Sequence, residues 1–113
     1  MSSVWLGAMR LVLQVPGAQS LKDSRRVAAS LRDRVRHRFD VSVHELDVGE
    51  SRSRRALIIT TGGEDARLIR STLDQVHALV NSSGDCFLID VDVELLQWHP
   101  GMRDWTADRG AEE

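Results

Sequence analysis

The sequence predicts an α+β sandwich in which strands and helices follow the order β-α-β-β-α-β. Two segments repeat apolar residues with the period of a helix, two strand-like segments are almost continuously apolar, and two more alternate apolar and polar residues. A chain of 113 residues fits one domain with its own core. We expect a single domain over residues 1–97 and a partly disordered C-terminal tail over residues 98–113.

The first strand is predicted from Val4 to Val15, where branched apolar residues follow one another almost without interruption. Such a run is typical of a strand that is buried on both faces. Side chains alternate between the two faces of a strand. One face therefore carries every second residue from Trp5 to Leu13, and the other carries Leu6, Ala8, Arg10 and Val12.

The first helix follows a turn at Pro16–Gly17. Ser20 is its predicted N-cap, and Asp23 is the acid expected in its first turn. At about 100° per residue, the apolar side chains of this segment form one stripe. The stripe consists of Leu21, Ala28, Leu31, Val35 and Phe39, and Phe39 ends the helix.

The middle of the chain supplies two strands. Val41–Leu46 alternates in polarity, which predicts a half-exposed edge strand. A polar loop from Asp47 to Arg54 follows it. Arg55–Thr61 then contains a short apolar run that is typical of a central strand.

The last two predicted elements are a helix and a strand. The helix begins after the break at Thr60–Gly63 and runs to about Asn81. Cys86–Leu96 alternates strictly, which predicts a strand with one covered face. The apolar face of this strand carries Phe87, Ile89, Val91, Val93 and Leu95, and the polar face carries Asp90, Asp92 and Glu94.

This order of elements is the split βαβ pattern of a ferredoxin-like fold. Right-handed crossovers place both helices on one face of a four-stranded antiparallel sheet. In this topology the first and third strands are central, and the second and fourth are edges. The two continuously apolar strands are the first and third, so the local pattern and the topology agree.

The segment from Pro16 to Asp47 resembles the YlxP-like family of small bacterial proteins, known mainly as a domain of unknown function. The matching pattern is Pro-Gly-x-x-Ser-Leu-Lys at residues 16–22, the Arg25–Arg26 pair, and Asp-Val-Ser-Val-x-Glu at residues 40–45. The resemblance implies a ferredoxin-like fold. Genes of this family commonly sit beside those for translation initiation and ribosome-binding factors, which implies a role near the ribosome. The family has no established catalytic residues to carry over.

Charge on the first helix is lopsided, with seven Lys and Arg residues against Asp23 and Asp33. On a helical wheel one flank carries four cations, and Arg34 and Arg38 lie on the other flank. The predicted nucleic-acid-binding residues are Lys22, Arg25, Arg26, Arg32 and Arg36. The alternative is a solvated helix face whose long side chains shield the apolar stripe.

Composition narrows the function classes. Residues 1–40 carry a net charge of +5 and residues 41–113 a net charge of −7, so a local basic surface fits but bulk nucleic-acid coating does not. No apolar run approaches the roughly 20 residues that span a bilayer, and Cys86 is the single cysteine, without an internal disulfide partner. We therefore expect a cytoplasmic protein with no membrane partner.

The sequence offers little catalytic chemistry. Its four histidines are scattered, so we expect no metal site and no cofactor. Without a visible pairing of nucleophile and base, we expect no enzymatic activity. A base-stacking module is also disfavoured, because the predicted open sheet face has no aromatic platform and carries Asp90, Asp92 and Glu94.

Two hypotheses remain. In the first, the protein is a non-enzymatic factor associated with ribosomal RNA or the ribosome, which binds the phosphate backbone through the basic helix. In the second, it is a homo-oligomeric scaffold, most simply a dimer, or a small-ligand regulatory protein. The second hypothesis uses the open sheet face, where Leu6, Ala8 and Val12 form an apolar surface that no helix covers.

Overall fold

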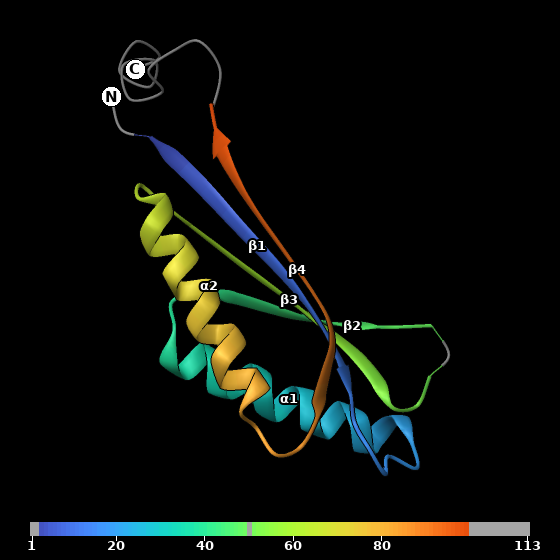
Figure 1. Ribbon diagram of the computed structural model, residues 1–113. Helices are drawn as coiled ribbons and strands as arrows, with labels where there is room; N and C mark the ends of the chain where they lie inside the picture. Colours follow the sequence, from blue (N-terminus) through green and yellow to red (C-terminus); the bar gives the residue numbers. More distant parts are fainter. Residues whose placement is uncertain (1–2, 50, 100–113) are drawn as a thin grey trace, which may run out of the picture.

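The computed structural model describes residues 3–49 and 51–99. It confirms the predicted order of elements (Figure 1). The elements are β1 (Val4–Gln14), α1 (Leu21–Arg38), β2 (Ser42–Asp47), β3 (Arg54–Gly63), α2 (Ala66–Asn81) and β4 (Phe87–Trp98). Of the predicted tail, residues 98–113, only Trp98 and His99 are described, and Trp98 still belongs to β4.

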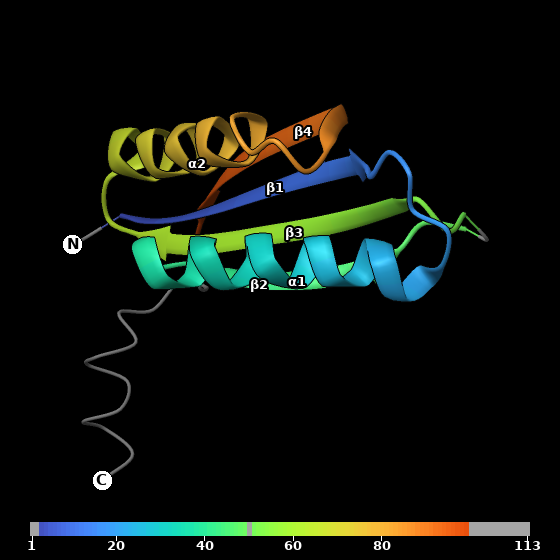
Figure 2. The ribbon, with the colours of Figure 1, turned by 90° about the horizontal axis from the view of Figure 1, so that it is seen from below.

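The four strands form one antiparallel sheet in the order β2-β3-β1-β4. As predicted, β1 and β3 are central and β2 and β4 are the edges. Both helices lie on the same face of the sheet (Figure 2), with α1 against β2 and β3 and α2 against β1, β3 and β4. This arrangement is the ferredoxin-like α+β sandwich, and neither α1 nor α2 covers the opposite face of the sheet.

The start of α1 is fixed by local hydrogen bonds. The Ser20 hydroxyl accepts from the backbone N–H of Asp23 at 3.2 Å, as expected of an N-cap. The Asp23 carboxylate accepts in return from the backbone N–H of Gln19 at 3.0 Å. Leu21, predicted to belong to the apolar stripe, is 40% exposed in this first turn, whereas Ser24 is fully buried and donates to the Leu21 carbonyl at 3.1 Å.

The core lies between the helices and the sheet. Alternate residues of β1 from Met9 to Leu13 are buried beneath the helices. The expectation that this strand is buried on both faces is wrong, because Leu6, Ala8 and Arg10 on its other face are exposed. The buried residues pack with Ala28, Leu31 and Val35 of α1 and with Ile69, Leu73, Val76 and Val80 of α2. Because these residues lie on one stripe of each helix, their burial orients the remaining side chains of α1 toward β2 and the solvent.

Gly7 sets how closely α2 approaches the sheet. A Cβ atom at this position would lie 2.5 Å from Cγ2 of Ile69 and 3.1 Å from Cδ1 of Leu73. The Ile69 methyl group belongs to a β-branched side chain with little rotamer freedom. A glycine on β1 therefore lets the buried face of α2 rest against the backbone of the strand.

The β4 strand departs from the predicted alternation. Its register with β1 shifts by one residue, because Val12 pairs with Asp90 and Leu13 pairs with Leu88. Ile89 is the extra residue of a β-bulge. As a result Leu88, and not Phe87, packs on the core, while Phe87 and Ile89 are 63% and 47% exposed. The prediction that Phe87 and Ile89 share the covered face is therefore wrong.

Candidate functional site

One flank of α1 faces the edge strand β2. The Arg32 guanidinium lies 2.8 Å from Oε1 of Glu45, and Nη2 of Arg36 donates to the Val43 carbonyl at 2.6 Å. Nη2 of Arg25 lies 3.8 Å from Oδ1 of Asp47. Contacts farther toward the N-terminus of α1 are therefore made to residues farther toward the C-terminus of β2, because the helix and the strand run antiparallel.

These contacts join a larger network, which we call the β2 ion-pair network: Arg25, Arg32, Asp33, Glu45, Asp47 and Arg55. Arg55 is its buried member, with its side chain 5% exposed. Its guanidinium contacts the Asp47 carboxylate, and Nη2 lies 3.9 Å from Oε2 of Glu45. The Arg55 Nε is buried without a hydrogen-bond partner among the described residues. The network therefore attaches α1 to the β2 edge of the sheet.

The network also shifts two ionisation equilibria. The hydrogen bond from Arg55 and then its charge lower the pKa of Asp47 below its ordinary value; desolvation opposes them, and the charge of Arg25 adds a lesser contribution in the same direction as Arg55. The hydrogen bond to Asp33 raises the pKa of Arg32, and the charges of Asp33 and Glu45 add to this. Both shifts favour the charged forms of Asp47 and Arg32, as expected for groups held in ion pairs.

The predicted binding residues therefore divide into two groups. Arg25, Arg32 and Arg36 already contact protein groups on β2. Lys22 and Arg26 are exposed and form no ion pair within residues 3–49 and 51–99. At about 100° per residue these two positions lie on the helix face opposite the buried stripe of Leu31 and its neighbours.

Three further arginines lie in the β2–β3 loop and at the start of β3, and each has a different partner. Nη1 of Arg52 donates to the Gln19 carbonyl at 3.3 Å, which brings the β2–β3 loop to the start of α1. Nε of Arg54 instead donates to the Gln14 side chain at 3.1 Å, across the β1–β3 pair. Arg55 is buried, where an external ligand does not reach it. The accessible cations at this end of α1 are Lys22, Arg25, Arg26 and Arg52.

A second feature is the open sheet face, meaning the face of the four strands that neither helix covers. At its centre Arg10 reaches to β4, where Nη2 lies 2.7 Å from Asp90 and 2.5 Å from Asp92. Two of the three carboxylates predicted on this face are therefore paired within the sheet. Val12, which was expected to be exposed here, is only 8% exposed.

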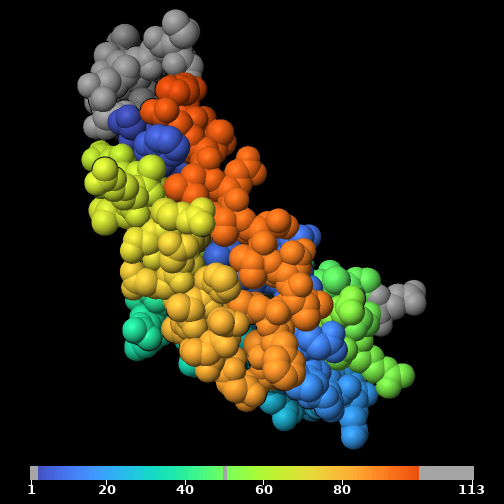
Figure 3. Space-filling view, in the orientation of Figure 1, coloured from blue at the N-terminus to red at the C-terminus, as the bar shows by residue number. Residues whose placement is uncertain are grey.

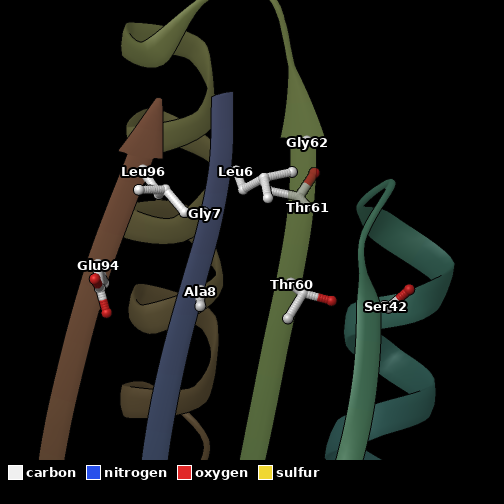
Figure 4. Close-up of a pocket in the computed structure, with 9 residues that line it drawn as sticks. All are labelled: Leu6, Gly7, Ala8, Ser42, Thr60, Thr61, Gly62, Glu94 and Leu96. Carbon is white, nitrogen blue, oxygen red and sulfur yellow. The ribbon is translucent and has the colours of Figure 1, made fainter. Parts of the chain in front are cut away.

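A shallow hollow lies at one end of the open sheet face (Figure 4). Leu6 and Leu96, which are 40% and 52% exposed, form its apolar part. Ser42, Thr60 and Glu94 line its polar part. The hollow gives the open sheet face an apolar contact surface, and a small-ligand role for it stays a prediction.

The register shift in β4 changes the aromatic content of this face. Phe87 pairs with Gln14 and Trp98 follows Leu96 by two residues, so both rings extend from the open side. They stand at opposite ends of the strand, roughly 35 Å apart at about 3.3 Å per residue. Such a separation does not form the contiguous platform on which neighbouring bases stack.

Titratable residues are dispersed over the fold. His37, His44, His77 and His99 lie on or after four different elements, and within the described ranges no three His, Cys, Asp or Glu residues could hold a metal ion. Burial raises the pKa of the Cys86 thiol, which disfavours the reactive thiolate. Neither of the two helices is long and apolar enough to cross a membrane. The cytoplasmic location stays a prediction.

The chain belongs to a family of unknown function: the family model described as protein of unknown function (DUF503) matches residues 6–93. The predicted membership of an uncharacterised family is thus confirmed, whereas the narrower YlxP-like name stays a prediction. No curated protein matches the chain.

Several solved structures are similar to the chain at low sequence identity. The de novo designed protein Foldit4 has a TM-score of 0.52 at 13% identity, covering 85% of this chain and 99% of its own. Structural genomics protein YJCS has a TM-score of 0.48 at 8% identity over 79% and 96% of the two chains. PA3566 from Pseudomonas aeruginosa has a TM-score of 0.45 at 16% identity over 88% and 96%. These likenesses concern the fold alone.

Proposed function

We propose that this protein is a non-enzymatic factor that binds the RNA phosphate backbone through the exposed cations at the start of α1. The observation that carries the proposal is the division within the helix. Arg25 and Arg32 have acidic partners on β2, whereas Lys22 and Arg26 are exposed without an ion pair among the described residues. Exposed cations without protein partners remain free to neutralise an external anion.

The charge pattern supports a phosphate ligand. Six of the seven Lys and Arg residues of α1 are exposed, and Arg32 is partly covered. Arg52 adds a cation from the β2–β3 loop next to the first turn. Several exposed cations near the start of α1 suit a repeating anion better than one small anion, because successive phosphates of a nucleic acid can each meet a separate side chain.

Ribosomal RNA is the target that the family resemblance indicates, and this narrower assignment is part of the proposal. Contacts of this kind are made to phosphate and give little sequence preference. We therefore expect binding that depends on RNA length and charge more than on base identity. The open sheet face does not take part, because its exposed Glu94 repels phosphate.

Titration of the full chain with ribosomal subunits, and with single-stranded RNA of mixed sequence, tests the proposal. The logarithm of the association constant should fall linearly with the logarithm of the salt concentration, with a slope of about −0.7 per phosphate contacted on a single strand. Three contacts would give a slope of about −2. Binding that is absent at low salt, or that does not change with salt, would contradict it.

A further inference from the structure

We infer that the open sheet face is the contact surface for a second copy of this chain, with β4 of one protomer lying over β2 of the other. The inference concerns a different surface from the proposed RNA contact. It starts from the two apolar side chains of the hollow, Leu6 and Leu96, which are 40% and 52% exposed beside the small side chain of Ala8. Apolar side chains grouped in this way on a sheet surface are typical of a partner contact.

The area of the open sheet face is close to the area that one partner buries in a standard protein–protein interface. Four strands spaced about 4.8 Å apart, with a mean length of about ten residues at about 3.3 Å per residue, give a projected area of roughly 600 Å². The relief of the side chains raises the accessible area toward the roughly 800 Å² that each partner contributes to a standard interface. An identical sheet face is an occupant of this size.

The positions of the carboxylates on the open sheet face favour one orientation of the two copies over another. The carboxylates of Asp90, Asp92 and Glu94 all lie on β4, at one margin of the open sheet face, and Arg10 pairs with the first two. Glu94 forms no ion pair among the described residues. A two-fold axis across the strands would lay β4 on β4 and place these carboxylates against each other, which is unfavourable where water is excluded.

A two-fold axis parallel to the strands avoids this conflict. It reverses the strand order, so that β4 of one protomer lies over β2 of the other. His44, Arg10 and Asp92 belong to one row across the sheet, through the pairings of β2 with β3, β3 with β1 and β1 with β4. The axis therefore places Asp92 opposite His44 of the second copy, and the uncharged Ser42 near Glu94. Donors on β2 thus face acceptors on β4.

The free edge of β4 is a poorer contact for a second copy. The strand lies along one side of the molecule in Figure 3. Antiparallel pairing of two such edges about Asp92 would place Asp90 opposite Glu94, and like charges directly opposite in a ladder are destabilising. The bulge at Ile89 further interrupts a regular edge. Stacking of the open faces is therefore favoured over extension of the sheet.

Sedimentation equilibrium of the full chain tests the inference. The wild type should have twice the 12.7 kDa chain mass, and Leu6→Glu should return it to the monomer mass. Leu68→Glu is the matched control, because Leu68 is 66% exposed on α2, away from the open sheet face, and should leave the dimer intact. Circular dichroism spectra of both variants should match that of the wild type, which would show that the variants remain folded.

A thiol crosslinker of roughly 8 Å tests the orientation, because stacked sheets lie ~10 Å apart and the two facing cysteine side chains both extend into that gap. In a Cys86→Ala background, Ser42→Cys combined with Glu94→Cys should crosslink between protomers, whereas Glu94→Cys alone should not. Crosslinking of Glu94→Cys alone would overturn the orientation. The proposed interface would be wrong if the wild type stayed monomeric at millimolar concentration or if the Leu6→Glu variant still formed a dimer. The open sheet face would then have another occupant, such as residues 100–113.

Discussion

Nη1 of Arg32 on α1 lies 2.8 Å from Oε1 of Glu45 on β2. Glu45 has a side chain that is only 17% exposed, so this ion pair lies between the helix and the edge of the sheet. Arg32, one of the predicted nucleic-acid-binding residues, thus contacts an acid of the sheet edge instead of lying free on the surface. Because Arg32 is engaged in this ion pair, we propose Lys22 and Arg26 as the residues that contact the ligand.

Charge reversal at Arg32 should destabilise the protein. Arg32→Glu would place a carboxylate beside Glu45 and Asp33, where two acids now share one guanidinium. We expect a clear decrease in the midpoint of urea unfolding. Lys22→Glu changes the charge by the same amount on the exposed face of α1, and an equal decrease in that variant would show that the Arg32 ion pairs have no structural role.

Stability should fall in acid through Asp47. Because Arg55 lowers the pKa of Asp47 in the folded protein, the unfolded chain binds a proton more readily, with an ordinary pKa of about 3.9. Its contribution is therefore complete above about pH 4 and is lost as the pH falls through the lower folded pKa. Thermal unfolding of Asp47→Asn should show a shallower acid dependence than the wild type. Asp74→Asn, in the exposed pair with Arg70 on α2, should keep the wild-type profile.

Gly7 should tolerate no side chain. Gly7→Ala brings a Cβ atom to 2.5 Å from Cγ2 of Ile69, so α2 or its side chain must shift. Overpacking of this kind costs about 1–3 kcal/mol in the free energy of unfolding. Gly84→Ala is the control, because a Cβ atom there meets nothing within 4 Å and the backbone φ is not positive. Equal stability of Gly7→Ala and the wild type would mean that α2 sits farther from β1.

The β4 bulge predicts an unequal response of neighbouring apolar residues. Ile89 is 47% exposed, whereas Val91 packs against the core on the covered face. Ile89→Ala should change the free energy of unfolding by less than about 1 kcal/mol, and Val91→Ala should cost more, because only the second removes packing against buried residues. The reverse order in denaturant unfolding would show that the strand pairs without the bulge.

Local signals in the sequence were sufficient for much of the fold. The Ser20 cap and the stripe through Leu31 lie within one helix, and they predicted the bounds of α1 without knowledge of its neighbours. The face of Phe87 could not be predicted in this way. It depends on a one-residue shift between β4 and β1, and the shift falls where Phe87, Leu88 and Ile89 are all apolar, so polarity does not distinguish the two faces there.

The sequence identified the cations of the candidate site, but it did not show which of them are engaged by other parts of the protein. The helical wheel grouped the arginines that turned out to face β2, yet it could not identify the element beside that flank. One signal was present: alternation in β2 puts Glu45 on the covered face with the buried Val43, and a buried acid needs a cationic partner. Arg55, on the same face of β3 as Leu57, required an acid for the same reason.

Comparison of two double variants in ribosomal-subunit binding tests the central claim most directly. Lys22→Ala/Arg26→Ala removes two exposed cations near the start of α1. Arg34→Ala/Arg67→Ala is the control, because it removes the same charge from the C-terminal half of α1 and the start of α2. These two segments lie at the other end of the helical layer (Figure 2). The first variant should lower the steepness of the salt dependence by about 1.4, because two side chains no longer neutralise a phosphate at about 0.7 each, and the second should leave it unchanged. Equal binding by the first variant and the wild type at every salt concentration would contradict the account.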